Sequence, residues 1–173
     1  MPISVAGIWT NSRNQEGFTL LEIMVVLVLI SIITGFAVLS LGRRDTGERL
    51  AEEARRLAAL IELSRQEALL RGEQRGILFT ETSYAFWKWV PGEEWRLVSD
   101  TDLLSERTLP SDFKLRLEVE GRSIAFGDTD APQVLLLSSG EATEFKLVLS
   151  AEYVRGYVIA GNLTGELELR SMQ

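Results

Sequence analysis

The 173-residue sequence predicts an α+β fold in which a long N-terminal helix, membrane-spanning and then amphipathic, packs on a sandwich-like head of antiparallel β-sheet. Three observations predict it. An uncharged apolar run from Ile23 to Gly42 is long enough for a membrane helix. Apolar side chains then recur at alternating spacings of three and four up to Ala68. From Arg75 onward the pattern changes to short alternating segments separated by Gly, Pro, Asp and Ser.

The first apolar run predicts one membrane-spanning helix. About twenty residues that rise ~1.5 Å each match the roughly 30 Å of hydrocarbon in a bilayer. Glu22 stands directly before this run, and a carboxylate there is costly unless it has a partner, which makes Glu22 a candidate functional residue. Arginine counts alone favour an outside N-terminus, because one arginine precedes the span and three follow it closely: Arg43, Arg44 and Arg49.

The second run predicts an amphipathic helix. Its stripe consists of Leu50, Ala54, Leu57, Ile61, Ser64 and Ala68, and the other faces carry Glu52, Glu53, Arg55, Arg56, Glu62, Arg65 and Glu67. Gly72 is a natural left-handed residue after a helix, and Arg71 suits the negative end of the helix dipole. The helix is therefore predicted to end near Arg71.

The junction between the two runs leaves two alternatives open. Asp45 and Glu48 have the spacing of a capping box, and Gly42 and Gly47 flank them, so the chain can break or kink there. Otherwise a single helix continues from Phe18 into the amphipathic segment.

The head is predicted to be mostly antiparallel sheet. Its strands are Ile77–Thr80, Tyr84–Val90, Trp95–Val98, Lys114–Val119, Ser123–Phe126, Val134–Leu137, Phe145–Leu149, Tyr157–Ile159 and Glu166–Leu169. Lys114–Val119 and Glu166–Leu169 alternate cleanly between one apolar and one polar face. The strand Val134–Leu137 is apolar on both faces, which predicts a central position between the helix and a second layer.

Aromatic residues concentrate in one predicted hairpin. Tyr84 and Phe86 share one face, Trp87 and Trp89 share the other, and Trp95 follows on the next strand. Exposed aromatic residues favour a protein contact. The alternative is that one set lies in the core and an adjacent loop covers the other.

The composition argues against an enzyme and against a metal or cofactor site. The chain has no cysteine and no histidine, so it lacks the commonest nucleophile, general base and zinc ligands. The turn Asp128–Asp130 lacks the spaced ligands of a calcium loop. The segment Ser138–Glu141 is predicted to be a hairpin turn, because no histidine can activate its serines. No catalytic, cofactor-binding or metal-binding residue is expected.

The hexapeptide Gly17–Glu22 lies before the apolar run, whereas a secretory signal is cleaved after its apolar core. It resembles the processing site of type IV pilins and type II secretion pseudopilins. The resemblance implies cleavage after Gly17 by a prepilin peptidase, N-methylation of Phe18, and filament assembly through the apolar helix. It also implies that Glu22 pairs with the Phe18 amine of an adjoining subunit, beside the remaining motif residues Thr19, Leu20 and Leu21. The alternative is a plain membrane anchor with a chance match.

Two further segments narrow the resemblance. The strand and turn Leu135–Phe145 and the helical segment Ala51–Leu57 are similar to H-type minor pseudopilins of type II secretion. That family implies a pilin-like fold and a single-pass inner-membrane protein with its head in the periplasm. It also implies partners among the minor and major pseudopilins, and a place near the pseudopilus tip in support of protein export across the outer membrane.

The expected organisation therefore has four parts: a leader peptide at 1–17, a transmembrane helix segment at 18–42, an amphipathic helix at 43–71, and a β head domain at 72–173. The alternatives are a minor pilin of a type IV pilus or DNA-uptake filament, and a membrane-anchored enzyme or receptor. The net charge is −7 and the C-terminal stretch 162–173 has no basic stripe, so no nucleic-acid binding is expected.

Overall fold

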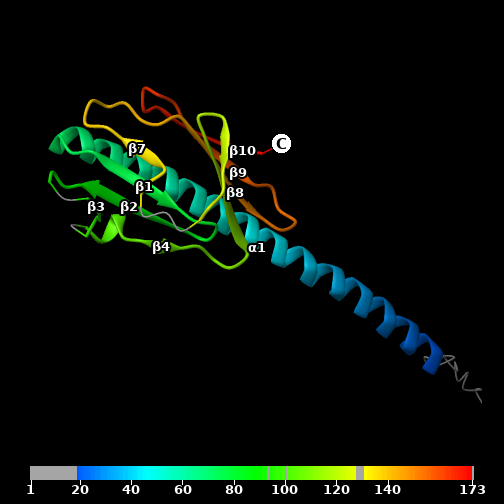
Figure 1. Ribbon diagram of the computed structural model, residues 1–173. Helices are drawn as coiled ribbons and strands as arrows, with labels where there is room; N and C mark the ends of the chain where they lie inside the picture. Colours follow the sequence, from blue (N-terminus) through cyan, green and yellow to red (C-terminus); the bar gives the residue numbers. More distant parts are fainter. Residues whose placement is uncertain (1–18, 93, 100, 128–130, 173) are drawn as a thin grey trace, which may run out of the picture. The chain divides into compact units, whose positions relative to one another are not determined.

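The computed structural model describes residues 19–92, 94–99, 101–127 and 131–172, without the side chains of residues 36–44. The predicted leader, Phe18 and the acidic turn 128–130 lie outside the described residues. The chain forms two compact units, Met1–Ser40 and Leu41–Gln173. The helix α1 (Leu20–Arg71) contributes residues to both (Figure 1).

In the first unit the described chain is helical from Leu20. From Leu20 to Ile33 its large apolar side chains are exposed at every position except Glu22 and Ser31. Within the described residues, no helical stretch combines the length and the apolar character that a membrane crossing requires. The predicted span 23–42 falls partly on residues whose side chains lie outside the description.

In the second unit the predicted stripe of α1 is its buried face. All six stripe residues are fully buried, namely Leu50, Ala54, Leu57, Ile61, Ser64 and Ala68. Gly42 and Gly47 both lie within the helical backbone, so no break occurs there. Of the two alternatives, the continuous helix is therefore the one observed, and Asp45 and Glu48 form no capping box, because an N-cap needs a non-helical residue before the first turn.

The C-terminal end of α1 is where the sequence predicts it. Gly72 follows Arg71 with a φ of 67°, and the backbone amide of Glu73 donates to the carbonyl oxygen of Ala68 at 3.1 Å. This is the Schellman arrangement, in which a left-handed glycine lets the chain satisfy carbonyl groups of the last turn. The turn redirects the chain into the first strand.

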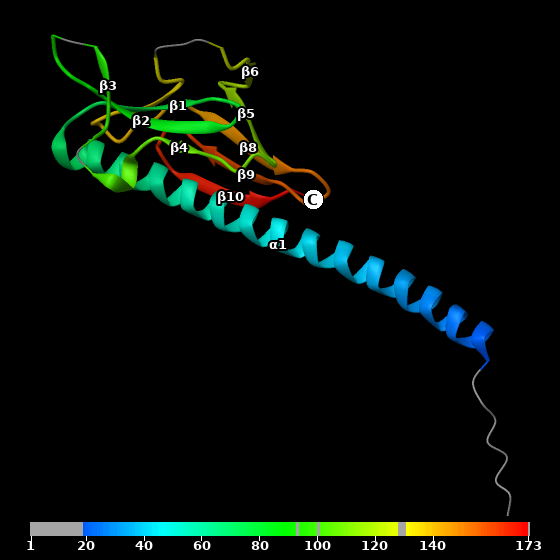
Figure 2. The same cartoon turned by 90° about the horizontal axis from the view of Figure 1, so that it is seen from below.

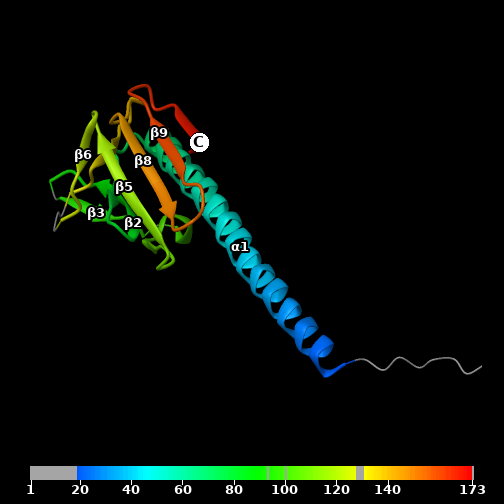
Figure 3. The same cartoon turned by 90° about the vertical axis from the view of Figure 1, so that its right-hand side faces the viewer.

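Two antiparallel sheets form the rest of the second unit. Sheet A has the order β3-β2-β1-β7, with β4 also paired to β2, and comprises β1 (Arg75–Phe79), β2 (Ser83–Trp89), β3 (Trp95–Leu97), β4 (Arg107–Thr108) and β7 (Val134–Leu136). Sheet B has the order β10-β9-β8-β5-β6 and comprises β5 (Phe113–Val119), β6 (Arg122–Ile124), β8 (Phe145–Ala151), β9 (Tyr157–Gly161) and β10 (Leu167–Ser171). Figure 3 shows β6, β5, β8 and β9 side by side.

Two short elements have no counterpart in the prediction, the strand β4 and the 3₁₀ helix η1 (Asp102–Leu104). Both are too short to show a period. Within sheet A, β7 lies at the end of the strand order and pairs with β1 alone among the named strands. The returning chain covers its other edge through the bridge from Leu136 to Ala142.

One apolar core joins the helix and the two sheets. Figure 2 shows both sheets on the same side of the second half of α1. The core takes side chains from α1, β1, β2, β7, β5, β8 and β9, for example Leu57, Ile77, Phe86, Leu117 and Leu147. At about 25 cal/mol per Å² of apolar surface, this burial is the main stabilising contribution available to a chain without disulfides.

Candidate functional site

The start of α1 brings part of the predicted assembly motif together. The backbone amide of Glu22 donates to Thr19 Oγ1 at 3.2 Å, and the amide of Ile23 donates to the carbonyl oxygen of Thr19 at 3.3 Å. Thr19 therefore caps the helix, and Glu22 lies in the first turn, where a negative charge interacts favourably with the helix dipole. The sequence analysis missed this cap, although the threonine-to-glutamate spacing of three is its usual signature.

The other motif residues have different positions. Leu20 and Leu21 lie in the first turn, with exposed fractions of 79% and 72%. Gly17 and Phe18 lie outside the described residues. The described part of the motif, Thr19 to Glu22, thus forms an exposed and capped helix N-terminus. Glu22 is the one ionisable side chain among these four residues.

Beyond this first turn, the helix carries apolar side chains on all of its sides. The exposed fractions of its large apolar side chains range from 41% to 79%, and these residues occupy consecutive positions over more than two turns. A helix that is apolar on every side needs a partner on every side. The described residues of the first unit therefore present an interaction surface.

In the second unit, Glu53 forms a buried polar contact that the sequence analysis missed. It was assigned to a polar face, yet only 7% of the residue is exposed. Its Oε1 accepts hydrogen bonds from Tyr84 Oη and Arg107 Nε, each at 2.9 Å, and its Oε2 accepts from Arg107 Nη2 at 3.3 Å. These partners lie on β2 and β4, so the contact fastens α1 to sheet A.

The electrostatics of this contact favour one protonation state. Burial, followed by the charge and the hydrogen bond of Glu53, raises the pKa of Tyr84. The hydrogen bond to Glu53 raises the pKa of Arg107. The tyrosine therefore stays a neutral donor and the arginine a cation, which suits a structural contact and not a proton transfer.

The aromatic hairpin has one buried and one partly open face. Tyr84 and Phe86 are fully buried and meet edge to face, with centroids 6.0 Å apart. Trp87 is half-buried, and Trp89 is exposed and packs on Trp95 with centroids 5.6 Å apart. One aromatic set thus belongs to the core, as one of the two alternatives predicted.

The loop before β7 covers part of the other face. A Cβ atom at Gly76 would lie 2.5 Å from Pro132 Cβ and 3.3 Å from the Trp95 ring, so the proline packs directly on the backbone of β1. Leu97 and Trp89 remain exposed beside it. This face of sheet A is therefore covered at Gly76 and exposed at Trp89 and Leu97.

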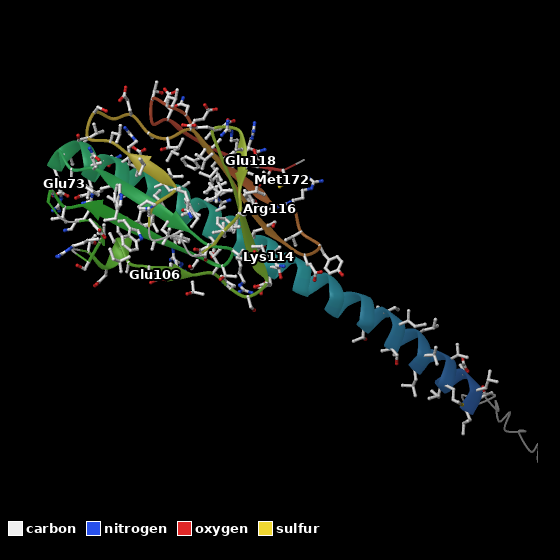
Figure 4. The ribbon with its side chains drawn as sticks, viewed as in Figure 1. Glu73, Glu106, Lys114, Arg116, Glu118 and Met172 are labelled. Atoms are coloured by element: carbon white, nitrogen blue, oxygen red, sulfur yellow. The ribbon has the colours of Figure 1, made fainter. Side chains whose placement is uncertain are left out.

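The outer face of sheet B is polar and hollowed at one end. Figure 4 labels Lys114, Arg116 and Glu118, which succeed one another along β5. A hollow of about 760 Å³ is lined by Lys146 and by five glutamates from three segments, namely Glu118, Glu120, Glu144, Glu166 and Glu168. Lys146 Nζ lies 3.1 Å from Glu118 Oε2. The described residues contain no group of three acidic side chains arranged to hold a metal ion.

The segment Ser138–Glu141 is the turn that the sequence predicts. The amide of Gly140 donates to the carbonyl oxygen of Leu137 at 3.0 Å, and Gly140 has a φ of 94°. Ser139 Oγ lies 3.1 Å from Glu141 Oε2, its own turn partner. The serines thus complete a turn and are not arranged as nucleophiles.

Two family models match the chain. The prokaryotic N-terminal methylation motif matches residues 12–38, and the type II transport protein GspH matches residues 53–165. The chain is also 34% identical to type II secretion system protein H of Pseudomonas aeruginosa over 158 residues, which cover 86% of this chain and 90% of that protein. It is 32% identical to the protein of the same name from Escherichia coli over 148 residues, which cover 80% and 82%.

Solved structures show the same fold. The minor pseudopilin EpsH of Vibrio cholerae superposes with a TM-score of 0.64 at 20% identity, over 72% of this chain and 97% of that chain. The solution structure of Escherichia coli GspH gives a TM-score of 0.60 at 22% identity, over 75% and 94%. The predicted α+β fold with a helix packed on antiparallel sheets is therefore confirmed as pilin-like. With the two family matches and the identities above, the chain belongs to the GspH family of type II secretion minor pseudopilins, which are structural and non-enzymatic proteins.

Proposed function

We propose that the chain is made as a precursor, cleaved after Gly17 by a prepilin peptidase and N-methylated on Phe18. The observation that carries this proposal is the match of residues 12–38 to the methylation motif, together with a capped helix that begins within two residues of the proposed cut. The segment 18–42 then anchors the protein in the bacterial inner membrane, with its head in the periplasm.

The proposed role is assembly with other minor and major pseudopilins near the tip of the pseudopilus, in support of protein export across the outer membrane. The exposed apolar surface between Leu20 and Ile33 supports helix-to-helix contacts. Among packed apolar helices the Glu22 carboxylate lies in a medium where an unpaired charge costs about 2.5 to 3.5 kcal/mol. The amine created at Phe18 of an adjoining subunit neutralises this charge and fixes the register between the two helices.

The test is Glu22→Ala in cells that lack the native gene. We expect normal membrane insertion and normal cleavage, but reduced cross-linking to neighbouring pseudopilins and reduced export, because the amine loses its carboxylate. Glu48→Ala is the matched control, since it removes an exposed glutamate from the same helix in the second unit. Cross-linking and export at wild-type levels in Glu22→Ala would disprove the role of Glu22 in assembly.

A further inference from the structure

We propose that the second unit binds the phosphate group of an anionic lipid headgroup in a hollow beside α1. The hollow has a volume of about 460 Å³. It is lined by four arginines, two glutamates and two apolar residues: Arg49, Arg55, Arg56, Arg107, Glu52, Glu53, Pro110 and Phe113. The proposal rests on the membrane anchoring proposed above.

The first argument is the charge that remains available in the hollow. Glu53 already accepts a hydrogen bond from Tyr84 and forms an ion pair with Arg107, whose charge offsets its own. Arg55 and Arg56 are exposed and form no hydrogen bond or ion pair with any other residue in the described part of the chain. Their guanidinium groups can therefore bind an anion without losing an existing contact.

Arg49 adds a third cation that is only loosely held. Its Nη1 lies 3.9 Å from Asp112 Oδ2, and both side chains are nearly half exposed. Its guanidinium carbon lies 5.7 Å from the centroid of the Phe113 ring. A single long contact at an exposed position contributes little, so most of its donors remain available.

The second argument is the chemistry of the donors. A guanidinium group is a planar fork of N–H donors that can bind two phosphate oxygens at once. Several such groups around one hollow suit a tetrahedral anion with oxygens on every side. The ring of Phe113 and Pro110 provide an apolar wall, on which the C–H groups of the lipid's glycerol backbone can pack.

The third argument is distance along the helix. Within the second unit α1 is helical from Leu41, and Arg49 follows the end of the predicted span at Gly42 by seven residues. At ~1.5 Å per residue this is about 10 Å, slightly more than the Debye length of about 8 Å in physiological salt. The attraction between a basic side chain and an anionic bilayer falls off over about that length, so Arg49 lies at the edge of its range. The protein as a whole is acidic, with a net charge of −7, so a local cationic site would set which side faces the lipid.

The experiment measures lipid binding to the full chain, purified in a neutral detergent, by native mass spectrometry with added phosphatidylglycerol. We expect the double variant Arg55→Gln and Arg56→Gln to bind phosphatidylglycerol about tenfold more weakly than the wild type, because two cations are lost. A higher salt concentration should weaken the binding of phosphatidylglycerol to the wild type and reduce the difference in affinity between the wild type and the double variant. Phosphatidylcholine should show no such difference, because its headgroup has no net charge.

The matched control is the double variant Arg122→Gln and Arg170→Gln. It makes the same change in net charge through two exposed arginines on β6 and β10 of sheet B, neither of which lines the hollow. We expect it to bind phosphatidylglycerol as the wild type does. Equal binding by both double variants, whether both strong or both weak, would overturn the proposal.

Competition identifies the source of the phosphate. If glycerol phosphate displaces the lipid and inorganic phosphate at the same concentration does not, the site recognises the lipid headgroup. If both displace the lipid equally, the same site also binds free phosphate. Displacement by a glutamate-rich peptide alone overturns the proposal in favour of a protein partner. Resistance of the full chain to alkaline extraction from membranes is measured separately, so a failure of membrane anchoring is distinguished from a failure of this site.

Discussion

The two halves of α1 are both rich in apolar residues, but only in the second half are these residues buried by other elements that the structure describes. Between Leu20 and Ile33 the large apolar side chains are 41% to 79% exposed, whereas Leu50, Leu57 and Ile61 are completely buried. The second half carries its apolar residues in one stripe that two sheets cover, and the first half carries them on all sides. The difference indicates that the first half is built for partners outside its own chain.

The largest expected effect comes from truncating a leucine in each half. Leu57→Ala should lower the free energy of unfolding by about 3 kcal/mol, because it leaves a cavity in the core. Leu27→Ala should change it by less than about 0.5 kcal/mol, since Leu27 packs on no core. The measurement is urea unfolding of the full chain in detergent, monitored by tryptophan fluorescence. Similar losses in the two variants would show that the halves do not differ in this way.

A smaller effect is expected from the polar contact that fastens the buried half to sheet A. Glu53→Ala should cost about 2 kcal/mol, because the Tyr84 hydroxyl and the Arg107 guanidinium lose their acceptor. The value lies below that of a fully buried pair because the side chain of Arg107 is 41% exposed. Glu52→Ala, one residue earlier and exposed, is the control and should be nearly neutral. A neutral result for Glu53→Ala would mean that packing alone holds the helix on the sheet.

The smallest effect at neutral pH should come from Tyr84→Phe, and this variant has a pH dependence with a definite sign. The folded protein raises the pKa of Tyr84 above its ordinary value of 10.0, so the contribution of the neutral phenol is fully present below pH 10 and is lost above it. Wild-type stability should therefore fall by up to about 1.4 kcal/mol per pH unit above pH 10 through this group.

The control for that titration is the variant itself. Tyr84→Phe has no phenol at this position, so its unfolding free energy should fall less steeply between pH 10 and pH 11 than that of the wild type. Parallel curves for the two proteins would contradict a contribution from Tyr84. All buffers must have the same ionic strength, because surface ion pairs also change with pH and salt.

The predictable parts of the fold are those with local signals. The stripe from Leu50 to Ala68 follows from helical periodicity, and the end at Arg71 follows from Gly72. The strand β5 follows from clean alternation. In each of these the residues that determine the structure are neighbours in the sequence.

The parts that sequence analysis missed depend on distant residues or on very short elements. Glu53 is buried because Tyr84 and Arg107 reach it from 31 and 54 residues away, and no local pattern reports such partners. The edge position of β7 depends on a return segment that covers it. The cap at Thr19 was a local signal that the analysis overlooked, and the box at Asp45 was a local signal that the continuous helix overrides.

The most direct test of the account is the intact mass of the chain isolated from membranes of cells with an active prepilin peptidase. The account predicts a mature protein that begins at Phe18 and carries one added methyl group, and it predicts that Gly17→Val accumulates as the longer precursor because a bulkier residue blocks the cut. A wild-type chain that begins anywhere other than Phe18 would contradict the proposal that the exposed half of α1 is released for assembly by cleavage after Gly17.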